Sequence, residues 1–221
     1  MERPLVTLNE LVGPRHAALL IIDVQKDYCD SRLCRRDTQP TDELMPRLLG
    51  LMEAAREAGV RLIHVCTEHG DWTSTPSWLA RKWTENGQKP EMCRPGTEGA
   101  EFMPGFEPLP GEVVVTKNRY SGFIGTNLDM ILKSLGIKSI IATGTATNNC
   151  VEATARDGFM LDYYLVFCSD GTASYDRHLH ETTLINIKNH YGTVASIDEI
   201  VGAWEQTTGK QLRKQAVLAG A

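Results

Sequence analysis

The sequence lacks any apolar run of the roughly 20 residues that a transmembrane helix needs. Its first residues, Met-Glu-Arg-Pro-Leu, also lack the basic-then-apolar order of a secretory signal. We therefore expect a cytoplasmic protein with no membrane partner.

No Cys-x-x-Cys pair and no dense cysteine framework is present, which argues against a small secreted fold held by disulfides. The six cysteines lie far apart, at Cys29, Cys34, Cys66, Cys93, Cys150 and Cys168. We expect reduced thiols, most of them buried fillers.

A basic cluster is absent as well. The 23 Lys and Arg residues are scattered and are outnumbered by 28 Asp and Glu, which gives a net charge of −5. This balance disfavours nucleic acid as a partner and favours a small-molecule ligand.

What is present is a chain of 221 residues, 42% of them apolar, in which strand and helix patterns alternate. Predicted strands cover 17–23, 60–66, 113–116, 139–143, 164–168 and 194–197. Predicted helices cover 42–58, 126–135, 149–160, 178–190 and 197–204. This alternation predicts an α/β fold with a mostly parallel sheet.

One stretch, residues 67–111, interrupts the alternation and holds six of the ten prolines and three of the four tryptophans. A loop of that length in a compact domain is usually functional. With no repeat or linker in view, we predict a single domain over residues 1–221. Its core spans about 17–204, and residues 210–221 form a loosely held tail.

Three reactive side chains follow predicted strands. Ligands of open α/β sheets bind beyond the carboxyl ends of the strands, and Asp23, Lys117 and Cys150 all come at such ends. Cys150 falls in the first turn of the next predicted helix, where free N–H groups favour a thiolate nucleophile. Each residue also has a plain interpretation: Cys150 an inert buried thiol, Asp23 a turn cap, Lys117 a side chain extended to solvent.

Three blocks make the chain recognisable. They are Asp23-Val-Gln-Lys-Asp-Tyr28, Lys117-Asn-Arg-Tyr-Ser-Gly-Phe123 and Gly144-Thr-Ala-Thr-Asn-Asn-Cys150. Their order and spacing resemble those of the isochorismatase-like cysteine hydrolases, from about residue 17 to residue 204.

The resemblance implies a Rossmann-like three-layer α/β/α fold with a six-stranded sheet. It also implies a catalytic triad of Asp23, Lys117 and Cys150, no cofactor, and assembly as a homodimer or homotetramer. In that family a non-proline cis peptide bond precedes the cysteine, here between Thr145 and Ala146, and the N–H groups of Ala146 and Cys150 form an oxyanion hole.

Around these blocks the sequence looks most like the ureidoacrylate amidohydrolases, which implies cleavage of a ureido or N-carbamoyl C–N bond through a thioester-type intermediate. Relatives that act on biuret, triuret or other small amides share this chemistry. Nicotinamidases, another branch, bind a metal through an Asp-x-His pair and a further histidine. Here His69 and Asp71 stand in reversed order with no second histidine in the loop, so no metal is expected.

Five residues are candidates for binding substrate. Gln25, Asn118 and Tyr120 are candidates for hydrogen bonds, Trp72 for a pocket wall, and Arg119 for pairing with a carboxylate. Simple loop packing remains an alternative, most of all for Trp78 and Trp83, as does solvation for Arg119. Arg156 is expected to point away from the nucleophile.

Functions of other classes were weighed too. A dinucleotide-dependent oxidoreductase would need a Gly-x-Gly-x-x-Gly turn, which is absent after the first strand. A catalytically silent binding protein is possible for the fold, and a redox role for Cys150 would need a resolving cysteine.

Overall fold

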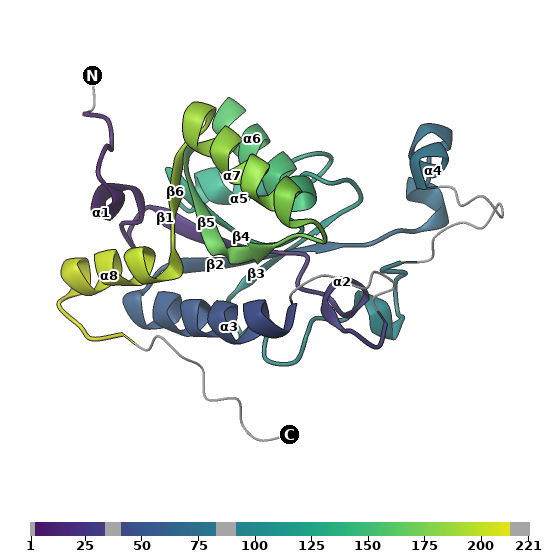
Figure 1. Ribbon diagram of the computed structural model, residues 1–221, viewed down its shortest axis with the longest axis horizontal. Helices are drawn as coiled ribbons and strands as arrows, with labels where there is room; N and C mark the ends of the chain where they lie inside the picture. The colour runs from purple at the N-terminus through teal and green to yellow at the C-terminus, as the bar shows by residue number, and fades with distance from the viewer. Residues whose placement is uncertain (1–2, 34–40, 83–91, 213–221) are drawn as a thin grey trace.

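The computed structural model describes residues 3–33, 41–82 and 92–212, without the side chains of residues 81 and 82. At its centre lies one six-stranded, all-parallel sheet with strand order β3-β2-β1-β4-β5-β6 (Figure 1). The strands are β1 (Ala17–Ile22), β2 (Arg61–Thr67), β3 (Val113–Lys117), β4 (Ser139–Thr145), β5 (Tyr164–Ala173) and β6 (Thr193–Ala195). The α/β prediction is confirmed.

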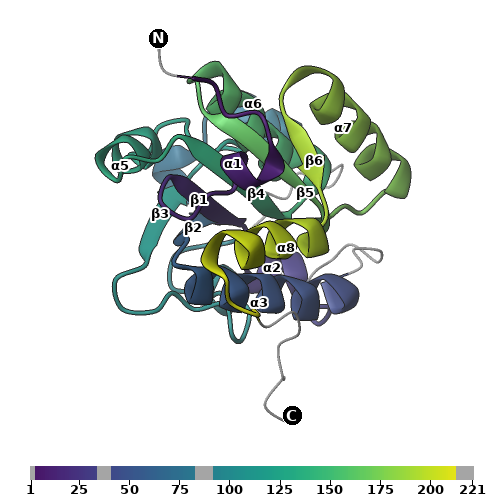
Figure 2. The ribbon, with the colours of Figure 1, turned by 90° about the vertical axis from the view of Figure 1, so that its left-hand side faces the viewer.

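Helices cover both faces of this sheet, so the fold has the three predicted layers (Figures 1 and 2). One face carries α3 (Thr41–Ala58) and α8 (Ile197–Thr208), and the other carries α5 (Leu128–Ser134), α6 (Glu152–Met160) and α7 (Arg177–His190). Shorter helices are α1 (Leu8–Leu11), α2 (Lys26–Cys29) and α4 (Pro76–Lys82).

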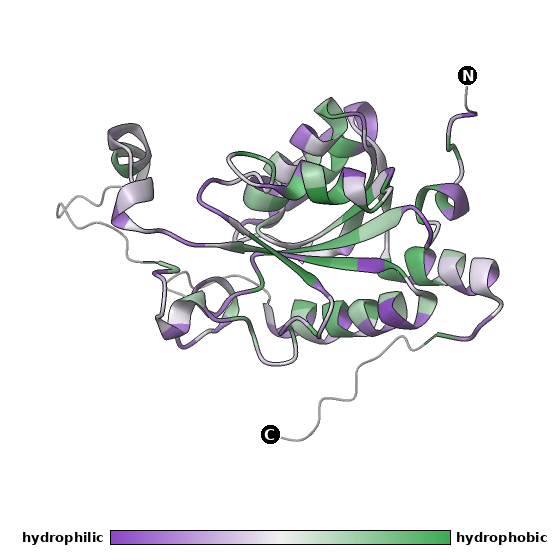
Figure 3. Ribbon diagram, turned by 180° about the vertical axis from the view of Figure 1, so that it is seen from behind, coloured by the Kyte–Doolittle hydropathy of each residue, from purple (hydrophilic) through white to green (hydrophobic). Residues whose placement is uncertain are grey.

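The two central strands explain why the sheet is buried. Every residue of β1 and of β4 is buried, and for β1 its continuous apolar run predicts this. In α3 the apolar residues at helical spacing, among them Leu44, Leu48 and Met52, are also buried. Figure 3 shows the strands coloured as apolar along most of their length, between helices of mixed polarity.

Some elements differ from the sequence prediction. β5 continues five residues past the predicted end at Cys168, and its pairing with β4 is irregular between Ala142 and Gly144. The segment 67–111 is not all loop, because it contains α4 and the 3-10 turns η1 (Asp71–Thr73) and η2 (Glu98–Ala100). Its residues 83–91, with Trp83, lie outside the described residues.

The chain end differs as well. Leu212, placed in the predicted tail, is buried and packs in the core beneath α3 and α8. Residues 213–221 lie outside the described part. Among the helices that are described, none is both long enough and apolar enough to cross a bilayer.

Candidate active site

Three strand ends meet at the carboxyl edge of the sheet. Asp23 follows β1, Lys117 ends β3, and Cys150 lies in the turn η3 (Thr147–Val151) that follows β4. Between β1 and β3 stands β2, whose last residue, Thr67, pairs in register with Lys117. The sheet topology therefore brings together the three residues that the sequence singled out.

Lys117 and Asp23 form a buried ion pair. Lys117 Nζ lies 2.8 Å from Asp23 Oδ2, and both residues are 1% exposed. The ammonium also donates to Thr67 Oγ1 at 2.6 Å and to the Arg119 carbonyl at 3.1 Å. All three N–H groups of Lys117 thus have acceptors, which buried charge requires.

Cys150 faces this pair. Both Asp23 and Lys117 act electrostatically on its buried thiol. Burial raises the pKa of Cys150, the Asp23 carboxylate raises it further, and Lys117 lowers it only in part, so that it stands at about 12. The expectation that the turn favours a thiolate is therefore wrong for the resting protein, because burial beside a carboxylate outweighs the helix dipole. The thiol needs a base.

The turn that carries Cys150 is fixed to Asp23. Thr145 Oγ1 donates to the Asp23 carbonyl at 2.9 Å, and Asp23 itself has a left-handed φ of 52°. The peptide bond between Thr145 and Ala146 is cis, as the resemblance implied. Thr147–Val151 form a π-type turn, so α6 begins at Glu152 and not near Asn149 as predicted.

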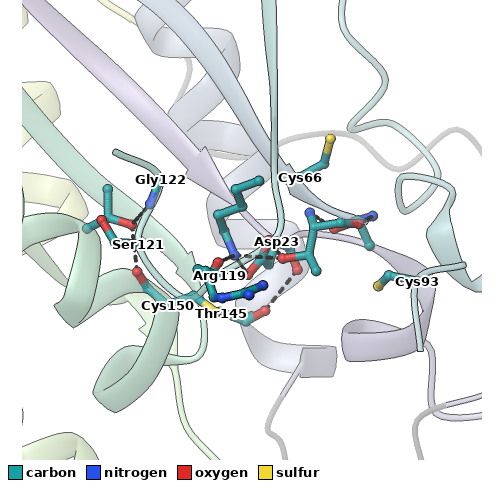
Figure 4. Close-up of polar contacts among 12 residues, drawn as sticks. Asp23, Cys66, Cys93, Arg119, Ser121, Gly122, Thr145 and Cys150 are labelled. Atoms are coloured by element: carbon teal, nitrogen blue, oxygen red, sulfur yellow. Dashed lines mark hydrogen bonds and ion pairs between the residues drawn. The ribbon is translucent and has the colours of Figure 1, made fainter. Parts of the chain in front are cut away.

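A cavity of about 60 Å³ opens over these residues. Asp23, Lys117, Ala146 and Cys150 all contribute to its wall. The other lining residues come from several separate parts of the chain: Tyr28, Thr67, His69, Ser74, Trp78, Leu79, Met92, Arg119, Tyr120, Thr145, Asn149 and Tyr175. Figure 4 shows Asp23, Thr145, Arg119 and Cys150 gathered together, with Cys93 lying apart.

Of the five predicted substrate-binding residues, two line the cavity, namely Arg119 and Tyr120. Arg119 donates to the carbonyls of Thr73 and Asn118 and lies over the Trp78 ring, 5.0 Å from its centroid. Among the described residues it makes no ion pair. Its charge therefore stands on the cavity wall with no carboxylate partner in the part of the chain that the structure describes.

The other three predicted contacts do not line the cavity. Gln25 is 1% exposed, and its side-chain amide is bonded to the backbone of Thr67 and Ala100. Asn118 Nδ2 donates to the Glu68 carbonyl at 2.7 Å. Trp72 is 83% exposed. The side-chain amides of Gln25 and Asn118 thus stabilise the loops. From the sequence alone this role cannot be distinguished from substrate binding.

The cavity has further lining residues. Trp78, for which the sequence leaves a pocket wall and loop packing both open, lies on the cavity wall, with its ring 5.0 Å from that of Tyr120 and 5.5 Å from that of His69. Tyr28 also lines the cavity, and burial raises its pKa well above the usual value. Tyr28 stands in the first recognisable block, which was the available signal. Thr67 directly follows the predicted strand 60–66, and this place at a strand end was the available signal for it.

His69 and Asp71, the pair considered for metal binding, have different surroundings. Asp71 is exposed and pairs with Arg94 at 3.0 Å, while His69 lies on the cavity wall. In the described ranges no group of three or more His, Cys, Asp or Glu side chains is arranged to hold a metal ion.

The remaining cysteines and Arg156 lie outside the cavity wall. Cys66 and Cys168 are buried, which raises the pKa of both thiols. Cys29 and Cys93 are buried too, and Cys34 lies outside the described residues. Arg156 is bonded to Glu152 and Tyr191, away from Cys150 as expected.

Comparison with known proteins agrees with this geometry. The isochorismatase domain family matches residues 17–199. The chain belongs to the isochorismatase family. Like other members of the isochorismatase family, it is a hydrolase.

Individual relatives show how far the similarity extends. The ureidoacrylate amidohydrolase RutB of Caulobacter vibrioides is 31% identical over 216 residues, covering 88% of this chain and 94% of that protein. A crystal structure of a cysteine hydrolase from Pseudomonas syringae pv. phaseolicola has a TM-score of 0.79 at 26% identity, covering 94% of this chain and all of that one. The N-carbamoylsarcosine amidase from Thermoplasma acidophilum has a TM-score of 0.67 at 27% identity, with 84% and 98% covered.

Proposed function

We propose that this enzyme cleaves the C–N bond of a small ureido (N-carbamoyl) substrate through a covalent intermediate on Cys150. The observation that carries the proposal is the buried Asp23–Lys117 pair placed against the Cys150 thiol at a cavity. A carboxylate in contact with a neutral thiol has the position of a general base. The names of two relatives, an amidohydrolase of ureidoacrylate and an amidase of N-carbamoylsarcosine, support the substrate class.

In the first half-reaction Asp23 accepts the Cys150 proton as the sulfur attacks the carbonyl carbon. The backbone N–H groups of Ala146 and Cys150 stabilise the resulting oxyanion. Asp23 then returns its proton to the leaving nitrogen as the C–N bond breaks. A thioester or thiocarbamate remains on Cys150, and an amine or ammonia departs.

In the second half-reaction Asp23 takes a proton from water, whose oxygen attacks the thioester carbon. The C–S bond breaks, the acid product leaves, and the thiolate recovers the proton from Asp23. Lys117 holds Asp23 in place in both steps through their 2.8 Å contact.

Arg119 supplies the specificity in this proposal. A guanidinium on the wall of the cavity matches the planar fork of a carboxylate, and Trp78 holds it from one side. We therefore propose a substrate that carries a carboxylate as well as a ureido group, with Tyr120 beside it on the wall.

Two expectations of assembly and context belong to the same proposal. We propose one domain over the whole chain, supported by the single sheet, working as a homodimer or homotetramer in the cytoplasm. Exposed apolar side chains such as Met160 and Ile185 support self-association. Light scattering on the purified protein would test the assembly.

The test of the chemistry is a substrate panel with wild type and Cys150→Ala side by side. Ureidoacrylate, an N-carbamoyl amino acid, biuret, triuret, nicotinamide and a simple aliphatic amide are incubated, and ammonia release and substrate loss are measured. We expect turnover of the ureido carboxylates, abolished in Cys150→Ala with the fold intact by circular dichroism. Near wild-type activity in the variant would refute the nucleophile, and preference for nicotinamide would refute the substrate class. No turnover at all would favour a binding protein.

A further inference from the structure

The Thr67 side chain is the member of this site that neither the sequence motifs nor the proposed mechanism uses. It is 1% exposed, ends β2, and stands between the strand ends that carry Asp23 and Lys117. Its hydroxyl lies 2.8 Å from Asp23 Oδ1 and 2.6 Å from Lys117 Nζ.

The direction of both hydrogen bonds follows from chemistry. An ammonium group has only donors, so Thr67 Oγ1 accepts from Lys117. The one hydroxyl proton is then free to go to Asp23 Oδ1, which has only lone pairs to offer when ionised. Since Lys117 donates to the other oxygen, Oδ2, both oxygens of the carboxylate accept a hydrogen bond from a buried partner.

The backbone of Thr67 is held on both sides. Gln25 Oε1 accepts from the Thr67 N–H at 2.7 Å, and Gln25 Nε2 donates to its carbonyl at 3.0 Å. The same Nε2 donates to the Ala100 carbonyl at 2.8 Å, so the long loop is tied to this point. The hydroxyl is therefore fixed in place before any substrate arrives.

We infer that Thr67 is a positioning residue that locks the plane of the Asp23 carboxylate. This inference rests on the proposed role of Asp23 as the base. Fixed donors on both carboxylate oxygens leave it one orientation toward Cys150. Without Thr67, one oxygen would lose its donor and the carboxylate would rotate more freely.

Other titratable groups act on the same carboxylate. They are Lys117 of β3, Cys150 of η3, Cys66 of β2, and Tyr28 and Cys93 from the segments packed on that side. His69 stands farther along the cavity wall. Thr67→Val leaves all of these side chains in place but removes one of the three acceptors of Lys117 Nζ, so the experiment reports on the Asp23–Lys117 pair as a whole.

The experiment compares Thr67→Val, which keeps the shape, with Thr67→Ser, which keeps the hydroxyl. Thr143→Val is the matched control, because Thr143 is also fully buried but donates to the Leu20 carbonyl in the sheet at 2.7 Å. Thr67→Ala serves as a second hydroxyl deletion in case valine does not fold. Readouts are kcat, KM and the pH profile of kcat/KM.

We expect Thr67→Val to lower kcat about tenfold or more, a loss typical of a hydrogen bond to a charged group. KM should stay within about twofold, and the pH profile of kcat/KM should differ from that of the wild type. Thr67→Ser should restore both values, and Thr143→Val should lose stability without changing either. Wild-type kcat and pH profile in both Thr67→Val and Thr67→Ala, or equal losses in Thr143→Val, would overturn the inference.

A second readout does not need turnover. Alkylation of Cys150 by iodoacetamide, followed by peptide mass spectrometry, depends on how Asp23 and Lys117 are held beside the thiol. The pH profile of this rate should change in Thr67→Val and return to that of the wild type in Thr67→Ser. If no substrate on the panel were hydrolysed, the proposed function would fail while this profile would still decide the role of Thr67, and an unchanged profile would refute it.

Discussion

The ammonium nitrogen of Lys117 lies 2.8 Å from Oδ2 of Asp23, although 94 residues separate the two along the chain. Removing two such charges from water is unfavourable unless each finds partners in place. Here the partners come from three adjacent strand ends, so the sheet itself holds the charges together. The thiol of Cys150 is the third group to meet them.

The first prediction concerns the acidity of Cys150. Burial and the Asp23 carboxylate both raise its pKa, to about 12. Because Asp23→Asn removes the negative charge and leaves Lys117, we expect the pKa of the thiol to fall in that variant while hydrolysis is lost. The midpoint of the pH dependence of the Cys150 alkylation rate measures the pKa of the thiol.

The opposite substitution provides the control for that measurement. Lys117→Met removes the group that lowers the pKa of Cys150, and the midpoint should then not fall. A midpoint unchanged by Asp23→Asn would mean that the carboxylate does not act on the thiol.

The second prediction concerns Arg119. In Arg119→Met we expect KM for a ureido carboxylate to rise by roughly 10- to 150-fold. This corresponds to about 1.5–3 kcal/mol of binding free energy, the usual contribution of a hydrogen bond to a charged group. KM for biuret, which has no carboxylate, should change little in the same protein. Equal losses on both substrates would mean that Arg119 only supports the packing of Trp78.

The third prediction concerns acid stability, far from the site. Glu112 accepts from Arg56 at 2.8 and 3.0 Å and lies 3.0 Å from His64 Nε2. Burial raises the pKa of Glu112, but the hydrogen bonds from Arg56, the Leu109 N–H and His64 lower it more, to about 2. A carboxyl group whose pKa is lowered in the folded state stabilises the fold at any pH above its pKa in the unfolded chain. This stabilisation is lost as the pH falls toward the folded-state pKa of about 2.

We therefore expect Glu112→Gln to lower the free energy of unfolding by about 1–3 kcal/mol at pH 7. Its stability should also depend less on pH between about 4.5 and 2 than that of the wild type. Urea unfolding at several pH values checks this, with the exposed Glu43→Gln as the control. A pH dependence identical in Glu112→Gln and wild type would contradict it.

The fourth prediction concerns Gly144 of β4, which pairs with Ile22 of β1. Its φ is +105°, and a Cβ there would lie 2.0 Å from the Ile22 carbonyl oxygen. We expect Gly144→Ala to destabilise the fold by more than about 2 kcal/mol, since backbone must move on both strands. Thermal unfolding measures the effect.

Gly202 in α8 is the matched site. A Cβ at Gly202 would meet nothing within 4 Å, so Gly202→Ala should be neutral or stabilising by up to about 1 kcal/mol. Comparable Tm values for the two alanine variants would show that the close approach at Gly144 is not needed.

Much of this protein was determined by its sequence. Short apolar runs predicted all six strands, because a parallel sheet that is covered on both faces needs apolar strands. Helical spacing of apolar residues predicted the helices between them. The rule that ligands bind beyond strand ends selected Asp23, Lys117 and Cys150, since those residues stand at those ends whatever the details of packing.

Tertiary structure alone decided how polar side chains are used. The sequence offers three residue types that are common in binding sites, Gln25, Asn118 and Trp72. In the folded protein the amides of Gln25 and Asn118 are hydrogen-bonded to loop backbone, and Trp72 is exposed to solvent. Thr67 carries no motif, yet its place between two strands puts its hydroxyl on both charges of the pair. Hydrogen-bond partners distant in sequence, and burial that raises a pKa as at Cys150, arise only when the chain has folded.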